Sequence, residues 1–296
     1  MKKNKPTLVW FCAITCNGNT HSLLSSNSNR LEQFLDSFEL IFHPSLTLDK
    51  TLDDVLSSDE TIDFLLVEGA ISSNEKFFTI SNNTALNHLN NLASKSKYII
   101  CVGSCASYGG VHAKFENSSK IGGVLDFLDE KIKANLSHEI INLTGCPVHP
   151  EWILQTLFTL NTFNKIPLDE QNRPKELYSS LAHHGCTRNE YFEWKVEGNF
   201  GQKDGCLFYS QGCRAPMTHS SCNKILWNEV SSKTRVGMPC IGCTEFDFPR
   251  NDMLETKKNM GIPFEVPIGI SKRAYLTISG VAKSFTIDRL HKKLMD

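Results

Sequence analysis

The sequence lacks any apolar run long enough to cross a bilayer. It also lacks the pattern of a secretory leader, because the strand-like segment 7–11 follows a short basic start and leaves no room for a hydrophobic region and a cleavage site. These absences predict no transmembrane segment and a cytoplasmic location. In that compartment cysteines stay reduced, so their thiols remain available to bind iron.

The chain has no excess of charge of either sign. It contains 31 Lys and Arg against 32 Asp and Glu, which gives a formal net charge of -1. Nucleic-acid binding needs clustered Lys and Arg, so we expect no nucleic-acid partner. Internal repeats and low-complexity tracts are also missing, and a length of 296 residues is typical of about two domains.

The first half of the chain alternates short apolar runs with longer helical stretches. The pattern predicts strands at residues 7–11, 40–42, 64–67, 98–102 and 140–143. Helices are expected at residues 21–36, 84–97, 123–135 and 151–163. Such alternation is typical of an α/β fold with a mostly parallel sheet. We expect a flavodoxin-like domain over residues 1–170.

A polar, proline-punctuated stretch at residues 164–178 has the composition of a linker. Beyond it the sequence is irregular and rich in Cys and Gly, with few periodic segments. We therefore expect a second domain over residues 171–296 that binds iron–sulfur clusters. Metal binding would supply folding energy that a small apolar core cannot.

Six of the eleven cysteines fall in this second region, and the pair His183–His184 precedes them. They are Cys186, Cys206, Cys213, Cys222, Cys240 and Cys243. A disulfide framework would need an oxidising compartment. A structural zinc site usually shows two close ligand pairs, whereas only Cys240 and Cys243 form a Cys-x-x-Cys pair here. Thiolates spread this widely suit iron–sulfur clusters, which are held by cysteine with occasional histidine.

Four further cysteines lie near the ends of predicted strands: Cys12, Cys16, Cys105 and Cys146. The loops at the carboxyl ends of parallel strands share one edge of the sheet and bind ligands there, so these thiols could converge. FMN binding is an alternative, because TCNGNT at residues 15–20 resembles the phosphate loop of flavodoxins. A flavin domain does not need thiols at three strand ends, which favours clusters.

Taken together, these motifs resemble the small, electron-transferring subunit of NiFe hydrogenases over nearly the whole chain. The resemblance rests on WFCAITCNGNTHSLL at the first strand, then EGA, GSCASYGG, GCPVHP, a His-x-x-Cys and the cysteine-rich stretch. The segment SSKTRVGMPCIGCTEFDFP is similar to the cytosolic uptake and hydrogen-sensing branch of that family.

The resemblance implies three clusters. A distal 4Fe-4S cluster, with one histidine in place of a thiolate, would be held by His183, Cys186, Cys206 and Cys213. A medial cluster would be held by Cys222, Cys240 and Cys243. The position that a fourth medial thiolate would occupy corresponds to Ser232, and serine is a poor iron ligand beside cysteine. We therefore expect a 3Fe-4S cluster there.

The third, proximal 4Fe-4S cluster is where the sequence departs from the family. The family has Cys-x-x-Cys after the first strand, but here Asn19 occupies the second position, and an amide oxygen is a weak iron ligand. Two additional cysteines, Cys12 and Cys101, each precede a family ligand by four residues. We expect Cys12 to replace the lost ligand, giving the set Cys12, Cys16, Cys105 and Cys146. Buried strand thiols at both positions, or a modified cluster that includes Cys101, remain alternatives.

Glu68, at the end of another predicted strand, has two possible roles. It could face the proximal cluster or relay protons, or its carboxylate could cap its own loop.

The resemblance also implies a function within a complex. A separate large subunit would hold the nickel–iron centre and split H2, while this chain, with no catalytic residue of its own, would pass electrons to an external acceptor docking near His183. The leading hypothesis is a cytoplasmic uptake hydrogenase that assembles as a higher oligomer of heterodimers. The alternatives are a hydrogen-sensing hydrogenase that signals to a kinase, and a free-standing ferredoxin-like or flavodoxin-like carrier.

Overall fold

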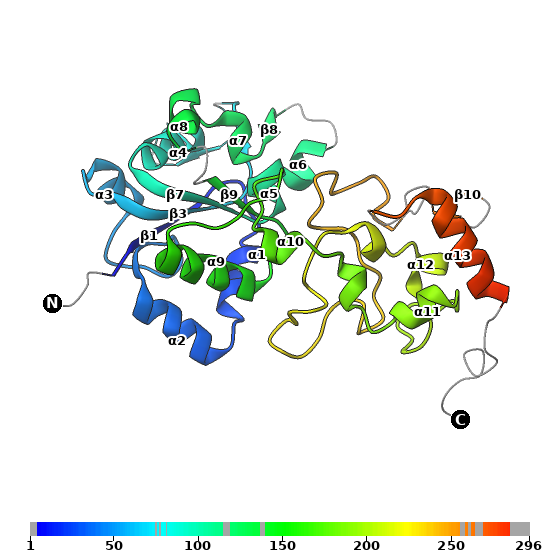
Figure 1. The fold of residues 1–296 in the computed structure, drawn as a ribbon. Helices are drawn as coiled ribbons and strands as arrows, with labels where there is room; N and C mark the ends of the chain where they lie inside the picture. Colours follow the sequence, from blue (N-terminus) through cyan, green and yellow to red (C-terminus); the bar gives the residue numbers. More distant parts are fainter. Residues whose placement is uncertain are drawn as a thin grey trace. The chain divides into compact units, whose positions relative to one another are not determined.

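The computed structural model describes residues 5–74, 76, 78–80, 82–114, 119–136, 140–254, 258–259, 262–263 and 269–284. The chain divides into two compact units, Met1–Glu176 and Leu177–Asp296, whose ribbons are drawn in Figure 1. The boundary predicted at residue 170 lies inside the first unit, shortly before the helix α10 (Lys175–Tyr178). Within the described residues, no helix combines the length and the apolar character that crossing a bilayer requires.

A parallel sheet of five strands forms the centre of the first unit (Figure 1). Its strands are β1 (Thr7–Cys12), β2 (Glu39–Phe42), β3 (Ile62–Glu68), β7 (Ser96–Val102) and β9 (Ile140–Leu143). They pair in the order β2-β1-β3-β7-β9, which is the flavodoxin-like order. All five predicted strands and the parallel α/β fold are therefore confirmed.

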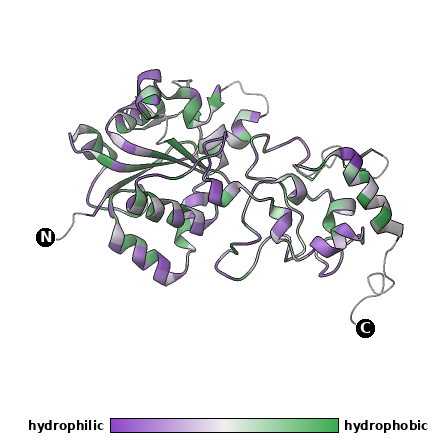
Figure 2. Ribbon diagram, viewed as in Figure 1, coloured by the Kyte–Doolittle hydropathy of each residue, from purple (hydrophilic) through white to green (hydrophobic). Residues whose placement is uncertain are grey.

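Helices cover both faces of this sheet. On one face Val9, Leu65 and Ile99 pack in a buried core cluster with Leu89 and other side chains of α4 (Ala85–Ser94). On the other face the ring of Phe38 contacts Phe64 of β3 and Phe158 of α9 (Pro150–Phe163), at centroid distances of 5.7 and 5.6 Å. Burial on both faces explains why these strands have few polar residues, and Figure 2 shows them mainly in the hydrophobic colour.

Two predicted helices are each interrupted by a polar capping residue. In place of one helix at 21–36 there are α1 (Gly18–Leu24) and α2 (Ser28–Ser37), because the Asn27 side chain accepts the Asn29 N–H and begins a new helix. Likewise α7 (Val124–Phe127) and α8 (Glu130–Asn135) replace the helix at 123–135, with Asp129 as the cap.

The first unit also contains short elements that were not predicted. They are α3 (Leu52–Ser57), α5 (Ser104–Tyr108), α6 (Gly110–Lys114) and the antiparallel pairs of β4 (Ile71–Ser72) with β8 (Ile121–Gly122) and of β5 (Thr79–Ile80) with β6 (Asn83–Thr84).

The second unit is irregular, as its composition predicts. Its short elements are η1 (Ala182–Gly185), α11 (Asn189–Glu193), α12 (Leu207–Gln211), η2 (Ala215–Met217), β10 (Lys258–Asn259) and β11 (Ile262–Pro263). A longer helix, α13 (Lys272–Ser284), was not predicted. The small core includes three cysteines, Cys206, Cys213 and Cys240, so thiols occupy the places that aliphatic side chains fill in an ordinary domain.

Candidate metal centres

Three thiols gather at the carboxyl end of the parallel sheet, and we call them the proximal site: Cys16, Cys105 and Cys146. Cys16 follows β1, Cys105 lies in the first turn of α5 after β7, and Cys146 follows β9. Burial, and then the charges of Cys146 and Cys16, raise the pKa of the Cys105 thiol to about 11. Three of the four cysteines expected to converge are therefore neighbours, whereas the interactions of the fourth, Cys12, are with Glu68, Thr20 and Trp10.

Glycines leave room for the sulfur atoms of this site. Gly110 adopts a φ of +60°, and a Cβ at that position would overlap the Sγ of Cys105. A Cβ at Gly18 would lie 3.2 Å from the Sγ of Cys16, close enough to crowd it. A larger residue at either position would press on a thiol that must face a ligand, so the glycines fit a site built for a bulky inorganic group.

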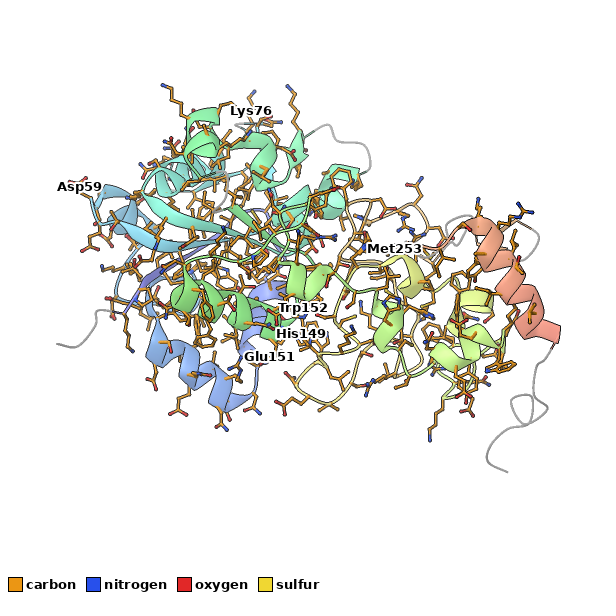
Figure 3. All side chains as sticks on the ribbon, viewed as in Figure 1. Asp59, Lys76, His149, Glu151, Trp152 and Met253 are labelled. Carbon is orange, nitrogen blue, oxygen red and sulfur yellow. The ribbon has the colours of Figure 1, made fainter. Side chains whose placement is uncertain are left out.

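The loops that carry Cys105 and Cys146 are joined by two hydrogen bonds. The Ser104 N–H donates to the Gly145 carbonyl at 2.9 Å, and the Gly145 N–H donates to the Ser104 Oγ at 3.0 Å. The second loop then leads into α9, where the His149 Nδ1 accepts the Glu151 N–H at 3.2 Å as the helix cap; Figure 3 labels both residues. These bonds fix the positions of the two thiols relative to each other.

Glu68 anchors the loop that follows β1. Its side chain is fully buried, and its carboxylate accepts hydrogen bonds from the N–H groups of Asn19 and Thr20, at 3.0 and 3.1 Å. It also accepts from Thr15 Oγ1, Thr20 Oγ1 and Trp10 Nε1, at 3.0, 2.6 and 3.1 Å. Four of these five donors belong to Thr15, Asn19 and Thr20, so Glu68 holds the loop that carries Cys16. The cap expected from the sequence was of Glu68's own loop after β3, and the loop that it caps is instead the one after β1.

The two additional cysteines lie in different environments. The Cys12 thiol contacts the Glu68 Oε2 at 4.0 Å; burial, and then the charge of Glu68, raise its pKa to about 12. Cys101 is fully buried in the apolar core cluster beside Val67 and Ile99, and burial raises its pKa to about 12. Cys101 therefore occupies the position of a packed strand thiol.

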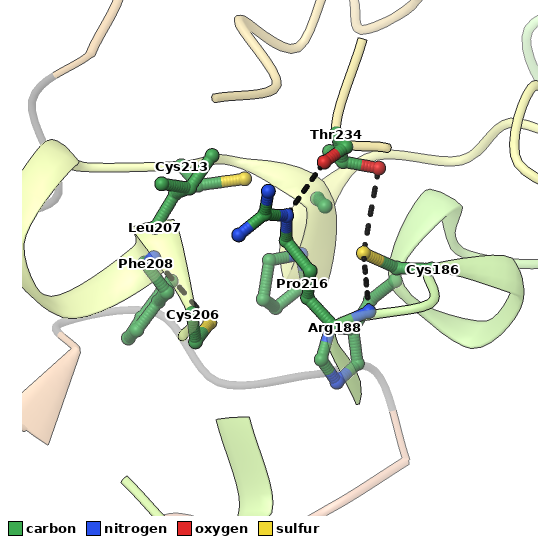
Figure 4. A pocket seen from close by; sticks show the side chains of 10 residues that line it. Cys186, Arg188, Cys206, Leu207, Phe208, Cys213, Pro216 and Thr234 are labelled. Carbon is green, nitrogen blue, oxygen red and sulfur yellow. Dashed lines mark hydrogen bonds between the residues drawn. The ribbon is translucent and has the colours of Figure 1, made fainter. Parts of the chain in front are cut away.

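A second group, which we call the distal site, lines one pocket of the C-terminal unit (Figure 4). It consists of His183, Cys186, Cys206 and Cys213. The Nε2 of His183 is buried and has no hydrogen-bond partner among the described residues. Burial, and then the charge of His184, lower the pKa of His183 to about 4. An imidazole that stays neutral with a free nitrogen fits a metal ligand.

Arg188 was not singled out in the sequence, although it follows the expected ligand Cys186 by two residues. It is buried and lines the same pocket (Figure 4). Its Nε donates to the Thr234 carbonyl at 2.7 Å and its Nη1 to the Gly205 carbonyl at 2.7 Å, while its Nη2 donates to the carbonyl of Gln202. Its charge lowers the pKa values of Cys206 and Cys213, against the larger effect of burial. It therefore provides a fixed positive charge beside the thiols.

A third group, which we call the medial site, consists of Cys222, Cys240 and Cys243. Burial raises the pKa of Cys240 well above its usual value, and the charges of Cys213, Cys222 and Cys243 add to this effect. Burial likewise raises the pKa of Cys222 to about 11, with a contribution from Cys243. The three cysteines expected at one cluster are thus neighbours, and Cys213 of the distal site is close to them.

Ser232, at the expected position of a fourth medial ligand, is buried and bonded to protein. Its hydroxyl donates to the Oδ1 of Asn223, which also accepts from the Thr234 Oγ1 at 2.9 Å. In turn the Cys186 thiol donates to the Thr234 Oγ1 at 3.4 Å. Ser232 therefore belongs to a hydrogen-bond network that extends to the distal site.

In the described part of the chain, no three Cys, His, Asp or Glu side chains are arranged to hold a single metal ion. A cluster of several iron atoms needs a wider shell of ligands, and the crowding glycines, the buried thiols and the neutral imidazole of His183 fit such a group. The first unit has thiols at the ligand-binding edge of a parallel sheet, and the irregular second unit has two more groups of thiols. This arrangement is typical of electron-transfer proteins whose cysteines bind iron–sulfur clusters.

Comparisons with known proteins then identify the family. Residues 16–160 match the family described as NADH ubiquinone oxidoreductase, 20 Kd subunit, and residues 178–255 match the C-terminal family of the NiFe/NiFeSe hydrogenase small subunit. The periplasmic [NiFeSe] hydrogenase small subunit of Desulfomicrobium baculatum is 32% identical over 83% of this chain and 85% of its own length. The chain belongs to the family of NiFe hydrogenase small subunits, as the sequence motifs indicated.

Solved structures agree with this assignment. A reduced, active form of the Ni-Fe-Se hydrogenase from Desulfomicrobium baculatum superposes with a TM-score of 0.71 at 27% identity, over 83% of this chain and 96% of that one. The actinobacterial-type NiFe-hydrogenase from Ralstonia eutropha H16 has the same fold, with a TM-score of 0.75 at 23% identity, over 99% of this chain and 93% of that one.

Proposed function

We propose that this chain is the electron-transfer subunit of a cytoplasmic NiFe hydrogenase, and that it passes electrons from H2 oxidation to an external acceptor. The observation that carries the proposal is the grouping of ten expected ligands into three sites, of which the last two adjoin through Cys213 and Cys240: Cys16, Cys105 and Cys146; Cys222, Cys240 and Cys243; and His183, Cys186, Cys206 and Cys213. A protein that passes electrons from one cluster to the next needs several such sites, whereas an enzyme with a single cofactor needs only one.

We assign a 4Fe-4S cluster to the proximal site, with Cys12 as the fourth ligand. The medial site would hold a 3Fe-4S cluster, because the Ser232 hydroxyl is already bonded to Asn223. The distal site would hold a 4Fe-4S cluster with His183 as one ligand. Such clusters supply one-electron transfer, at potentials set by ligand type, hydrogen bonds to sulfur and burial. The chain's own residues fix the ligand positions and provide those hydrogen bonds.

The proposed partner is a hydrogenase large subunit that holds the nickel–iron centre. This chain has only one Cys-x-x-Cys pair, Cys240 and Cys243, and both residues are assigned to the medial cluster. Electrons would enter at the proximal site and leave at the distal site, where an acceptor docks near His183. We also expect heterodimers of the two subunits to form a higher oligomer.

The proposal includes a cytoplasmic location, where thiols stay reduced and available to iron. Several similar proteins carry periplasmic in their names, so the location needs its own test. Cell fractionation with an antibody to this chain tests the location. Recovery in the periplasmic fraction would overturn this part of the proposal.

The alternative function is a regulatory, H2-sensing hydrogenase, which would use the same cluster ligands. The two functions differ in turnover, so the test is H2-dependent reduction of a viologen dye by the complex, isolated anaerobically through a tag on this chain. Fast reduction with a co-purified large subunit is expected for the uptake enzyme. Very slow reduction with that subunit present would favour the sensor, and absence of any partner would contradict both.

A further inference from the structure

We propose that Asn19 is a positioning residue, which ties the three ligand loops of the proximal site together, and is not an iron ligand. The inference rests on the proposed function, because it assumes a cluster at Cys16, Cys105 and Cys146. It concerns the one position where this chain departs from the Cys-x-x-Cys of its family.

Both ends of the Asn19 amide are bonded to backbone. Its Nδ2 donates to the Val102 carbonyl at 3.1 Å, and its Oδ1 accepts the Val148 N–H at 2.9 Å. Val102 ends β7, three residues before Cys105, and Val148 follows Cys146 by two residues. Asn19 itself follows Cys16 by three. One side chain thus connects the loops of all three thiols.

Two further contacts hold Asn19 in place. Its backbone N–H donates to the buried carboxylate of Glu68 at 3.0 Å, which adds the end of β3 to the connected loops. Its amide also packs against Gly103, where a Cβ would overlap both the Nδ2 and the Oδ1 atoms. Gly103 begins the turn that carries Cys105, so the close packing fixes that loop against Asn19.

These contacts argue against iron ligation by the amide. Asn19 is only 8% exposed and Val148 is fully buried, so turning the amide oxygen toward a cluster would leave the Val148 N–H buried and unpaired, which is costly. A thiol at this position would replace neither bond well, because it is a weak donor and a weak acceptor. At the position where the family has a cysteine ligand, this chain therefore has a residue that holds the loops in place. The fourth ligand of the proximal cluster comes from another residue, and we expect it to be Cys12.

The test compares Asn19→Ala and Asn19→Asp in the complex of both subunits, purified anaerobically. The matched control is Asn17→Gly, since Asn17 lies in the same loop, is exposed, makes no side-chain cap bond and has a φ of 57° that glycine adopts freely. The readouts are the iron and sulfide content, the rate of iron release to a chelator, and the EPR spectrum of the reduced proximal cluster. The clusters of the C-terminal unit serve as an internal reference.

The two possible roles of Asn19, positioning residue and iron ligand, predict opposite results for Asn19→Asp. Aspartate can still accept from the Val148 N–H but cannot donate to the Val102 carbonyl, so a positioning role predicts faster iron release from this variant. Mutation of supporting residues around metal sites typically weakens metal binding about 10- to 100-fold. If Asn19 were a ligand, the stronger carboxylate ligand would retain iron at least as well as the wild type.

For Asn19→Ala, a positioning role predicts that fewer molecules hold the proximal cluster, and that the EPR spectrum of the proximal clusters still present is unchanged. Unchanged occupancy with an altered spectrum would overturn the proposal, and so would iron retention by Asn19→Asp. The Asn17→Gly variant should match the wild type. A wild-type complex without iron and sulfide would instead contradict the proposed function itself, which keeps the two failures distinguishable.

Discussion

The backbone N–H of Cys240 donates a hydrogen bond to the Sγ of Cys213, with 3.1 Å between nitrogen and sulfur. Cys213 belongs to the distal site and Cys240 to the medial site, so ligands of the two proposed clusters contact each other directly. Hydrogen bonds to ligand sulfur help to set a cluster's potential. Because this donor is backbone, it also holds the two sites at a fixed separation, as an electron relay requires.

The buried charge of Arg188 should raise the potential of the distal cluster. Arg188→Gln removes this positive charge and so favours the oxidised state of the distal cluster, which carries less negative charge than the reduced state. We therefore expect the midpoint potential of the distal cluster to fall by on the order of 100 mV. An EPR-monitored redox titration of the complex measures this shift. Arg188→Lys retains the charge and serves as the control, so its midpoint should lie closer to that of the wild type. An unchanged midpoint in Arg188→Gln would contradict the assignment.

Ser232 should be dispensable for iron binding at the medial site. Its hydroxyl donates to Asn223, so Ser232→Ala removes a hydrogen bond but no proposed ligand. We expect an unchanged iron content and an unchanged EPR signal of the oxidised 3Fe-4S cluster. Cys243→Ala, which removes a proposed ligand, should lose that signal. Iron loss in Ser232→Ala would indicate that the serine is itself a ligand.

The sequence was sufficient to predict the sheet, because buried parallel strands such as Ile62–Glu68 and Ser96–Val102 are nearly continuous apolar runs. Helices as short as Ser104–Tyr108 were missed, since five residues cover little more than one helical turn and show no period. The break between α1 and α2 was also missed, because it depends on the local cap at Asn27.

The candidate sites were predictable only in part, for a physical reason. Cysteine spacing identifies ligands, but it does not show which residues support them. The acceptors of Arg188 include Gln202 and Thr234, which lie 14 and 46 positions away in the sequence. In the same way, the acceptor of the Asn19 amide is Val102, 83 positions away. Supporting contacts of this kind depend on the folded arrangement of loops.

His43 should make the stability of the complex depend on pH. Its Nδ1 accepts the Ser45 N–H at 3.0 Å, which assigns the proton to Nε2, next to Thr20 Oγ1 at 3.2 Å. Protonating Nδ1 would break the first bond, and burial lowers the pKa of His43 below its ordinary value of 6.5, although the charge of Glu68 opposes this. The stabilising effect of neutral His43 is therefore complete above pH 6.5 and is lost as the pH falls through the lowered pKa.

Thermal melting of wild type and His43→Gln at pH 7.5 and pH 5.5 measures this effect. Between the two pH values the wild-type melting temperature should fall more than that of the variant, because only the wild type loses the stabilising effect of neutral His43. Equal falls in the two proteins would show that His43 does not titrate differently on folding.

Cys12 and Cys101 provide a matched pair for testing the fourth proximal ligand. Both are strand thiols with a pKa raised to about 12, and they differ mainly in position. Cys12 ends β1, four residues before Cys16, whereas Cys101 is fully buried in the apolar core. We expect Cys12→Ser to lower the iron content of the proximal cluster and to change its EPR spectrum, because a hydroxyl is a weaker iron ligand than a thiolate. Cys101→Ser should keep both and lose only stability, since it buries a hydroxyl among apolar side chains. Undiminished iron in Cys12→Ser would eliminate Cys12 as a ligand, and iron loss in Cys101→Ser would indicate Cys101 instead.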